Sequence, residues 1–478
     1  MSIWKDIAEI AKDVQAGATS ATSLVDQALK IIDEKQRYSA IIATTTQRAQ
    51  ERAKEIDQRI ANGENIGRLA GVPFIAKDNF LTFGSETTAA SNILKGFTAP
   101  YQATAVEKLE AEGAICVAKA NLDAFAHGSS TENSDFFVTK NPHDVSKVAG
   151  GSSGGSASAV ILDLAPFALG TDTGGSIRQP ASFCGAVGLK PTYGLVSRSG
   201  VIAMASSTDV IGPITKTTRD AAIVLDVLAG KDPLDSTTIE RDPEGYSLKS
   251  QGLDLKSKKI GVIKEYMGEG LEQDVRNQVE LAISKLKDAG AQVEEISLPS
   301  LPLALACYYI VVPAEISSNL SRYDGQRYGF SKAGAKTLEE SYNWTRSEGF
   351  GNEAKRRIMI GTYVLSSGYY DAYYKRAQKL RTKLINEFSV AFSKVDFLIG
   401  PVVPNVAFDI GENANDPLKM YLQDIMTVAA NLVGIPAISL PAGLGKDSGL
   451  PVGVQIMAPQ KKDRQLLALA HAIEEKLQ

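Results

Sequence analysis

Cysteine and histidine are both scarce in this sequence, with three of each among 478 residues. An odd number of widely spaced cysteines argues against a disulfide framework and favours reduced thiols. No HExxH or CxxC pattern occurs, so we expect no dedicated metal site. The scarce residues are Cys116, Cys184, Cys307, His127, His143 and His471.

The sequence also lacks an excess of one charge and a long apolar run. Its 51 basic and 55 acidic residues give a net charge of −4 and form no block of like charge. Nucleic-acid surfaces need clustered lysine and arginine, so any RNA substrate would be held by a partner. The amino-terminal segment lacks the apolar core of a signal peptide, and no segment reaches the roughly 18 apolar residues of a membrane span. We therefore expect a cytoplasmic protein that does not contact a membrane.

Short apolar strands alternate with amphipathic helices along the chain. Strands are expected near Val72–Ala76 and Ala114–Ala118, and residues 258–299 follow a β-α-β pattern. A long helical pattern over Ala354–Lys394 is broken around Ser366–Gly368. Hydrophobic residues make up 44% of the chain, and no linker rich in proline, glycine or serine divides it. These features predict one α/β domain over residues 1–478, built on a central sheet.

Two glycine-rich segments carry the serines of greatest interest, GGSSGGS at Gly150–Ser156 and GTDTGGS at Gly170–Ser176. Glycine lets a substrate approach the backbone closely, and N–H groups freed in such loops can stabilise a developing negative charge. The segments could be structural turns. They could also form a nucleophile elbow, because Gly150–Gly154 matches G-x-S-x-G. That motif would need His471 as its base, within a helical pattern near the end of the chain.

A third interpretation uses Lys77 as the base. Lys77 ends the apolar run Val72–Ala76, which has the composition of a buried strand. Burial disfavours the charged amine and lowers its pKa, so a neutral lysine can accept a proton near neutral pH. Two serine hydroxyls could complete the relay, one as a bridge and the other as the nucleophile. This scheme needs no histidine.

Residues Gly150–Gly194 resemble the signature region of the amidase signature family. The resemblance implies a large mixed β-sheet covered by helices on both faces, and a Ser-cisSer-Lys triad. By position, Ser176 would be the nucleophile, Ser152 the bridging serine after a cis peptide bond, and Lys77 the base. The backbone N–H groups implied for the oxyanion site are those of Thr173, Gly174, Gly175 and Ser176. The residues implied to support the loop that carries Ser176 (residues 173–177, the nucleophile loop) are Asp172 and Arg178.

Other segments resemble the A-subunit family of the glutamyl-tRNA(Gln) amidotransferases, and the resemblance covers nearly the whole chain. These segments are Ser317–Gly329, Ser347–Arg381 and Tyr421–Gly443. The resemblance implies a glutamine site in which Arg357 binds the α-carboxylate, Asp424 the α-ammonium and Tyr308 the side-chain amide. The neighbouring Arg356 leaves the choice of arginine open.

The same resemblance implies a heterotrimer with the B and C subunits of the amidotransferase, and no cofactor in this chain. Ammonia would pass to the B subunit, which would hold the aminoacyl-tRNA and use ATP and Mg²⁺ to amidate its glutamyl or aspartyl group. His127 departs from that family, which typically has methionine here; we expect a packing role or an effect on substrate fit, and assign it no catalysis. A free-standing amidase for small or aryl amides and a non-catalytic scaffold remain alternatives.

Overall fold

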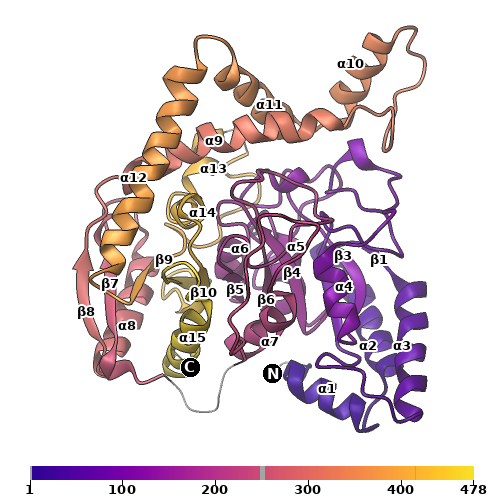
Figure 1. The fold of residues 1–478 in the computed structure, drawn as a ribbon, viewed down its shortest axis with the longest axis horizontal. Coiled ribbons are helices and arrows are strands. Elements are labelled where there is room, and N and C mark those ends of the chain that lie inside the picture. The colour runs from indigo at the N-terminus through magenta and orange to yellow at the C-terminus, as the bar shows by residue number, and fades with distance from the viewer. Residues whose placement is uncertain (1–2, 248–252, 415, 478) are drawn as a thin grey trace.

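A mixed β-sheet runs through the middle of the molecule (Figure 1). The computed structural model describes residues 3–247, 253–414 and 416–477. Within those residues the sheet has eleven strands in the order β1-β3-β2-β4-β6-β5-β10-β11-β9-β7-β8. The strands are β1 Ile41–Thr44, β2 Pro73–Lys77, β3 Ile115–Ala120, β4 Phe167–Asp172, β5 Val187–Lys190, β6 Val210–Thr215, β7 Lys259–Ile263, β8 Gln292–Ile296, β9 Phe397–Pro401, β10 Ala437–Leu444 and β11 Pro451–Met457.

The helices begin with an amino-terminal group and end with a carboxy-terminal helix (Figure 1). The first eight are α1 Ile7–Gln15, α2 Ala21–Glu34, α3 Thr46–Ala61, α4 Thr104–Ala111, α5 Gly154–Ile161, α6 Arg178–Cys184, α7 Thr218–Leu228 and α8 Gln273–Asp288. The others are α9 Ala304–Asn319, α10 Leu338–Gly349, α11 Asn352–Leu365, α12 Lys375–Phe392, α13 Pro417–Leu422, α14 Val428–Val433 and α15 Asp463–Leu477.

The central strands are covered on both faces. Every residue of β2, β3, β4, β6, β9 and β11 is buried. A strand buried at consecutive positions needs cover on each side, because successive side chains point to opposite faces of the sheet. Helices provide that cover, which confirms the expected α/β class with a mixed, doubly covered sheet. The three cysteines are free and buried within this core.

Most elements expected from periodicity are present. Strand β2 covers the apolar run before Lys77 and ends on that lysine. The β-α-β pattern corresponds to β7, α8 and β8, and its two strands pair in parallel. The expected break in the long helical pattern is also confirmed, because α11 ends at Leu365 and a π-helix at Tyr370–Tyr374 leads into α12.

Strands β5 and β6 were not expected from the sequence, because glycine interrupts both of them and proline also interrupts β6. They pair antiparallel, with Gly188 opposite Ile214. An ideal Cβ at Gly212 would lie 2.0 Å from the carbonyl oxygen of Leu189, so this position of β6 has no room for a side chain. The glycine that weakens the strand pattern in the sequence is thus required by the close approach of the two strands.

One segment, Leu301–Arg322, is long and apolar enough to span a membrane by length and composition, with a mean hydropathy of 1.4. It was not expected to meet that test, because polar residues such as Glu315 interrupt its apolar run. Half of its most apolar window is buried, and its main helix, α9, packs against α11, α12 and α14. These contacts are those of a core helix.

Candidate active site

Lys77 is fully buried at the end of β2, where it is surrounded by hydroxyl groups. Its Nζ donates to Ser152 Oγ at 2.8 Å, to Ser153 Oγ at 2.9 Å and to Thr171 Oγ1 at 2.9 Å. Burial lowers the pKa of Lys77 to about 7, against the opposing effect of the nearby Asp123 carboxylate. The amine is therefore placed to exchange a proton with Ser152 near neutral pH.

Ser152 lies two residues before the start of α5, after a cis peptide bond between Gly151 and Ser152. The expectation of a cis bond at this position is confirmed. The Gly151 N–H donates to Gln179 Oε1 at 2.8 Å, and Gln179 Nε2 donates to the Ser129 carbonyl at 2.9 Å. Gln179 thus ties the Ser152 segment to helix α6 and to the loop that carries Ser129.

Ser176 lies in the loop between β4 and α6, close to the Ser152 segment. The Ser153 N–H donates to the Ser176 carbonyl at 3.1 Å, which joins the two glycine-rich segments. Ser176 is 8% exposed as a residue, whereas Ser152 is fully buried. Within the described residues the Ser176 hydroxyl has no hydrogen-bond partner. Of the two serines expected in the triad, Ser176 is therefore the more exposed, and no hydrogen bond to a described residue fixes its hydroxyl.

The backbone of the nucleophile loop carries several unused N–H groups. Among the described residues, the N–H groups of Thr173, Gly174 and Ser176 have no hydrogen-bond acceptor. Gly175 differs, because its N–H donates to Asp172 Oδ1 at 2.9 Å. The resemblance implied that the Gly175 N–H is an oxyanion donor, and this is corrected, because the Asp172 side chain already accepts that N–H. The N–H groups of Thr173, Gly174 and Ser176 remain available to an oxyanion.

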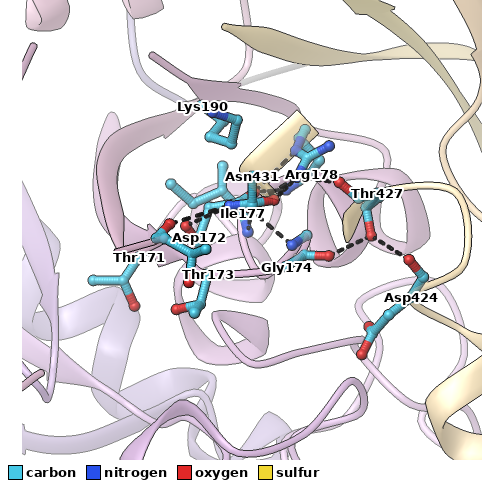
Figure 2. A network of polar contacts seen from close by, with 12 residues as sticks. Thr171, Asp172, Thr173, Gly174, Ile177, Arg178, Lys190, Asp424, Thr427 and Asn431 are labelled. Carbon is cyan, nitrogen blue, oxygen red and sulfur yellow. Dashed lines mark hydrogen bonds and ion pairs between the residues drawn. The ribbon is translucent and has the colours of Figure 1, made fainter. Parts of the chain in front are cut away.

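Gly174 and Gly175 are needed for close approach. An ideal Cβ at Gly174 would lie 2.6 Å from the Tyr308 hydroxyl oxygen, and one at Gly175 would lie 2.3 Å from Thr427 Oγ1. Figure 2 shows Thr427 between Gly174 and Asp424; its hydroxyl contacts the backbone carbonyl oxygens of both residues. The nucleophile loop is thus packed directly against the residues implied in glutamine binding.

Asp172 and Arg178 form a buried ion pair beneath this loop (Figure 2). Arg178 donates from Nε to Asp172 Oδ2 at 3.0 Å and from Nη2 to Oδ1 at 2.9 Å. Asn431 adds a donor to Asp172 Oδ1 at 2.9 Å. Burial alone would raise the pKa of Asp172, but the charge and hydrogen bonds of Arg178 lower it to about 2. The carboxylate is therefore ionised at neutral pH and can hold the Gly175 N–H.

Replacing Asp172 by asparagine should lower the free energy of unfolding by about 3–5 kcal/mol, because Arg178 would remain buried without an opposite charge. Urea titration of the two proteins measures the difference. The matched control is Glu295→Gln, which breaks an exposed pair with Lys264 (N to O distance 3.5 Å) and should cost ~1 kcal/mol or less. Equal losses of unfolding free energy in the two variants would contradict the larger contribution expected from the buried Asp172–Arg178 pair.

The three residues implied in the glutamine site converge from α9, α11 and the segment before α14. Arg357 is 3% exposed, whereas the Arg356 side chain is 44% exposed. Arg357 lies near the faces of Tyr309 and Tyr421, and its Nε donates to Glu353 Oε1 at 2.7 Å. Burial therefore favours Arg357 over Arg356 as the arginine of this site.

Asp424 is held by two hydroxyl groups that were not expected from the sequence. Ser129 Oγ donates to Asp424 Oδ1 at 2.7 Å, and the Tyr309 hydroxyl donates to Oδ2 at 2.8 Å. Burial raises the pKa of Asp424 to about 6, against the lowering effect of these hydrogen bonds. The carboxylate is thus mostly ionised at neutral pH. The adjacent Tyr308 contacts the nucleophile loop instead, at Gly174.

Other residues of the site were also missed by sequence reasoning. Ser153 and Thr171 lie within the glycine-rich motifs, so the motifs themselves could have indicated them. Tyr421 and Glu353 lie far apart in the sequence, and no local pattern relates them, although the Tyr421 hydroxyl donates to Glu353 Oε1 at 3.0 Å.

The nucleophile-elbow interpretation has no support in the site. His471 lies on α15, where its ring nitrogens face Glu474 and Glu475. His143 Nε2 lies 2.9 Å from the Cys184 carbonyl. Within the described residues neither histidine hydrogen-bonds Ser152 or Ser176, and no group of three or more histidine, cysteine, aspartate or glutamate residues is placed to hold a metal ion.

Known proteins are similar to this chain in both sequence and fold. The Amidase family model matches residues 23–467. The A subunit of the glutamyl-tRNA(Gln) amidotransferase of Thermoanaerobacter pseudethanolicus is 52% identical over 98% of this chain and 95% of its own length. The crystal structure of the corresponding A subunit of Thermotoga maritima is 41% identical with a TM-score of 0.79, covering 95% of this chain and 91% of that one.

A bacterial aryl acylamidase of the amidase signature family superposes with a TM-score of 0.85 but is only 26% identical, covering 99% of this chain and 96% of that one. The fold is thus shared across these amidases, and the higher sequence identity distinguishes the A subunits from the aryl acylamidase. On this evidence the chain belongs to the amidase family and, within it, to the A subunits of the glutamyl-tRNA(Gln) amidotransferases.

Proposed function

We propose that this chain hydrolyses glutamine through an acyl-enzyme and supplies ammonia to a tRNA-dependent amidotransferase. The observation that carries the proposal is the buried Lys77 amine, 2.8 Å from Ser152 Oγ, beside the loop that presents Ser176. Lys77 differs from a structural lysine in contacting the serine hydroxyls of a glycine-rich segment, which favours a catalytic base over a scaffold, because shifted amines beside nucleophiles are typical of active sites.

In the proposed reaction neutral Lys77 takes a proton from Ser152, and Ser152 takes one from Ser176. Ser176 Oγ then attacks the side-chain carboxamide carbon of glutamine. The free N–H groups of Thr173, Gly174 and Ser176 would stabilise the negative charge on the carboxamide oxygen. The proton returns through Ser152 to the leaving nitrogen, which departs as ammonia. Water then hydrolyses the glutamyl ester by the reverse relay.

The charges of the site suit the two charged groups on the α-carbon of free glutamine. Arg357 offers a planar guanidinium to the α-carboxylate, and Asp424 offers an ionised carboxylate to the α-ammonium. Tyr308 lies against Gly174, which supports a hydrogen bond between its hydroxyl and the carboxamide that Ser176 would attack. Asp172 and Arg178 touch no substrate in this scheme and instead hold the nucleophile loop.

The names of the relatives support an assembly, because each is the A subunit of an amidotransferase. We infer that this chain acts as one catalytic domain in a heterotrimer with the B and C subunits in the cytoplasm. The B subunit would bind the glutamyl-tRNA or aspartyl-tRNA, use ATP with Mg²⁺, and receive the ammonia. This chain itself would need no cofactor. The single continuous sheet supports one domain.

The test is ammonia release from glutamine and from simple amides, measured on the chain purified with its partners. We expect release that is selective for glutamine, and Arg357→Met should raise the glutamine KM roughly 100-fold by removing the partner of a charged carboxylate. Arg356→Met, with an exposed side chain, is the matched control and should change KM little. Faster turnover of simple amides would instead identify a free-standing amidase.

A further inference from the structure

Thr427 is a fully buried residue that the proposed mechanism does not use, although its hydroxyl reaches the nucleophile loop. The hydroxyl lies between two backbone carbonyl oxygens, those of Gly174 and Asp424 (Figure 2). A threonine hydroxyl has one proton to donate, and the Gly174 oxygen is the nearer of the two acceptors. The hydroxyl therefore donates to the nucleophile loop.

This hydrogen bond completes the support of the peptide group between Gly174 and Gly175. Thr427 binds the carbonyl oxygen of that peptide, and Asp172 Oδ1 accepts its N–H at 2.9 Å. A peptide between two glycines rotates more freely than most, and Gly175 has a φ of +136°, where residues with a Cβ are strained. Hydrogen bonds at both ends of the peptide thus fix an orientation that the backbone alone would leave free.

The same hydrogen bond acts on one of the proposed oxyanion donors. The Gly174 carbonyl that Thr427 holds and the Gly174 N–H belong to one residue, so holding the carbonyl limits the movement of that N–H. An N–H group stabilises a developing charge best when it is directed at the oxyanion before the reaction begins. Thr427 is thus placed to keep the Gly174 N–H directed without touching the substrate.

Thr427 is itself held on two sides. Its N–H donates to the Asp424 carbonyl at 3.0 Å, and Arg178 Nη2 donates to the Thr427 carbonyl at 3.1 Å. Arg178 is in turn paired with Asp172 beneath the loop. Residues 424–427 and the nucleophile loop are therefore tied to the same buried ion pair, which restricts the movement of one against the other.

We propose that Thr427 is a positioning residue, whose hydroxyl keeps the Gly174 N–H directed at the oxyanion and holds the nucleophile loop against residues 424–427. This inference rests on the proposed function and adds no group that contacts glutamine. The carboxamide oxygen becomes negatively charged only in the transition state, so a well-directed N–H stabilises that state more than the bound substrate. Loss of the Thr427 hydroxyl should therefore lower kcat and leave the glutamine KM nearly unchanged.

The first test measures kcat and KM for glutamine in the wild-type protein, Thr427→Val and Thr427→Ser, each purified with its partners. Valine keeps the shape of threonine without the donor, and we expect kcat to fall roughly tenfold with less than a twofold change in KM. Serine keeps the hydroxyl and should recover most of kcat. Thr45→Val is the matched control, because Thr45 is also buried, follows the edge strand β1 and donates to the Cys116 carbonyl at 2.6 Å. Both constants should be unchanged in that variant.

The second test compares two inhibitors, glutamate and the aldehyde analogue of glutamine, in which CHO replaces the carboxamide. In the aldehyde complex Ser176 Oγ would bond to the aldehyde carbon and the carbonyl oxygen would take the negative charge. The Ser176 proton would pass to Ser152 and Lys77, and no group would leave. Thr427→Val should weaken inhibition by the aldehyde roughly tenfold and by glutamate less than twofold, because only the aldehyde complex has an oxyanion.

An unchanged kcat in Thr427→Val, or equal weakening of the two inhibitors, would overturn the positioning role. Thermal unfolding of each variant measures stability, and a loss of stability with unchanged kcat would likewise overturn it. If Thr427→Val does not fold, the same measurements on Thr427→Ala decide the question.

Ser176→Ala separates this inference from the proposed function. Glutamine hydrolysis that survives in Ser176→Ala contradicts the proposed function. Loss of hydrolysis in Ser176→Ala, together with an unchanged kcat in the Thr427 variants, contradicts only the inference about Thr427.

Discussion

Ser176→Ala is expected to reduce glutamine hydrolysis by roughly 10⁴-fold or more, since removing the nucleophile of a serine relay leaves only binding and oxyanion stabilisation. Ammonia release from glutamine measures the loss. In the assembled amidotransferase, amidation driven by added ammonium salt should continue, because ammonia then bypasses the step that needs Ser176. Loss of glutamine hydrolysis with continued ammonium-driven amidation would show that the substitution removes the chemical step and leaves the complex assembled.

The matched control is Ser439→Ala. Ser439 is fully buried on β10, and its hydroxyl has no hydrogen-bond partner within the described residues. Removing that hydroxyl should leave glutamine hydrolysis and stability nearly unchanged. A Ser176→Ala protein that still hydrolyses glutamine at the wild-type rate would remove Ser176 from the mechanism.

Lys77→Met should lower kcat/KM for glutamine roughly 10²- to 10⁴-fold, the usual contribution of a general base. The wild-type pH profile should carry the signature of the same group. Only the neutral amine accepts a proton, so kcat/KM should rise as the pH rises through about 7 and level off above it. The residual activity of Lys77→Met should not show this rise with pH.

Lys190 provides a matched control for the pH profile. It is also fully buried, burial lowers its pKa to about 7, and its Nζ donates to the Pro191 carbonyl at 3.0 Å rather than to a serine. Lys190→Met should keep the rise in kcat/KM near neutral pH. If the rise in kcat/KM near neutral pH disappeared in Lys190→Met and persisted in a fully active Lys77→Met, Lys190 would be the titrating base instead.

Local patterns predicted much of the architecture and drew attention to the residues of the proposed triad. Periodicity of apolar residues predicted β2, the β-α-β unit and the break before α12, because helices and strands each impose a short repeat on the sequence. For the proposed triad, local signals left alternatives open, and the resemblance to the amidase signature family assigned the roles. Ser152 and Ser176 lie in glycine-rich motifs, and Lys77 ends an apolar run, so each carried a local signal. The glycine and proline of β5 and β6 removed that signal, and both strands were missed.

Tertiary structure alone decided how the site is completed. Arg356 and Arg357 are neighbours in sequence, but consecutive helix residues point about 100° apart, so one is exposed and the other faces Tyr309 and Tyr421. Likewise, Tyr309 rather than Tyr308 bonds Asp424. Such choices depend on which elements pack together, and no local repeat records them.

By itself, then, the sequence determined the α/β class through local periodicity and the family through the resemblance of its motifs, and it predicted the serine–lysine chemistry that we propose. The fold alone decided that Asp172 occupies the Gly175 N–H, that Ser129 and Tyr309 hold Asp424, and that both His127 nitrogens are left without partners among the described residues. The physical reason is distance along the chain. Ser129 and Asp424 are 295 residues apart, and only the packed sheet and its covering helices bring their oxygen atoms within 2.7 Å.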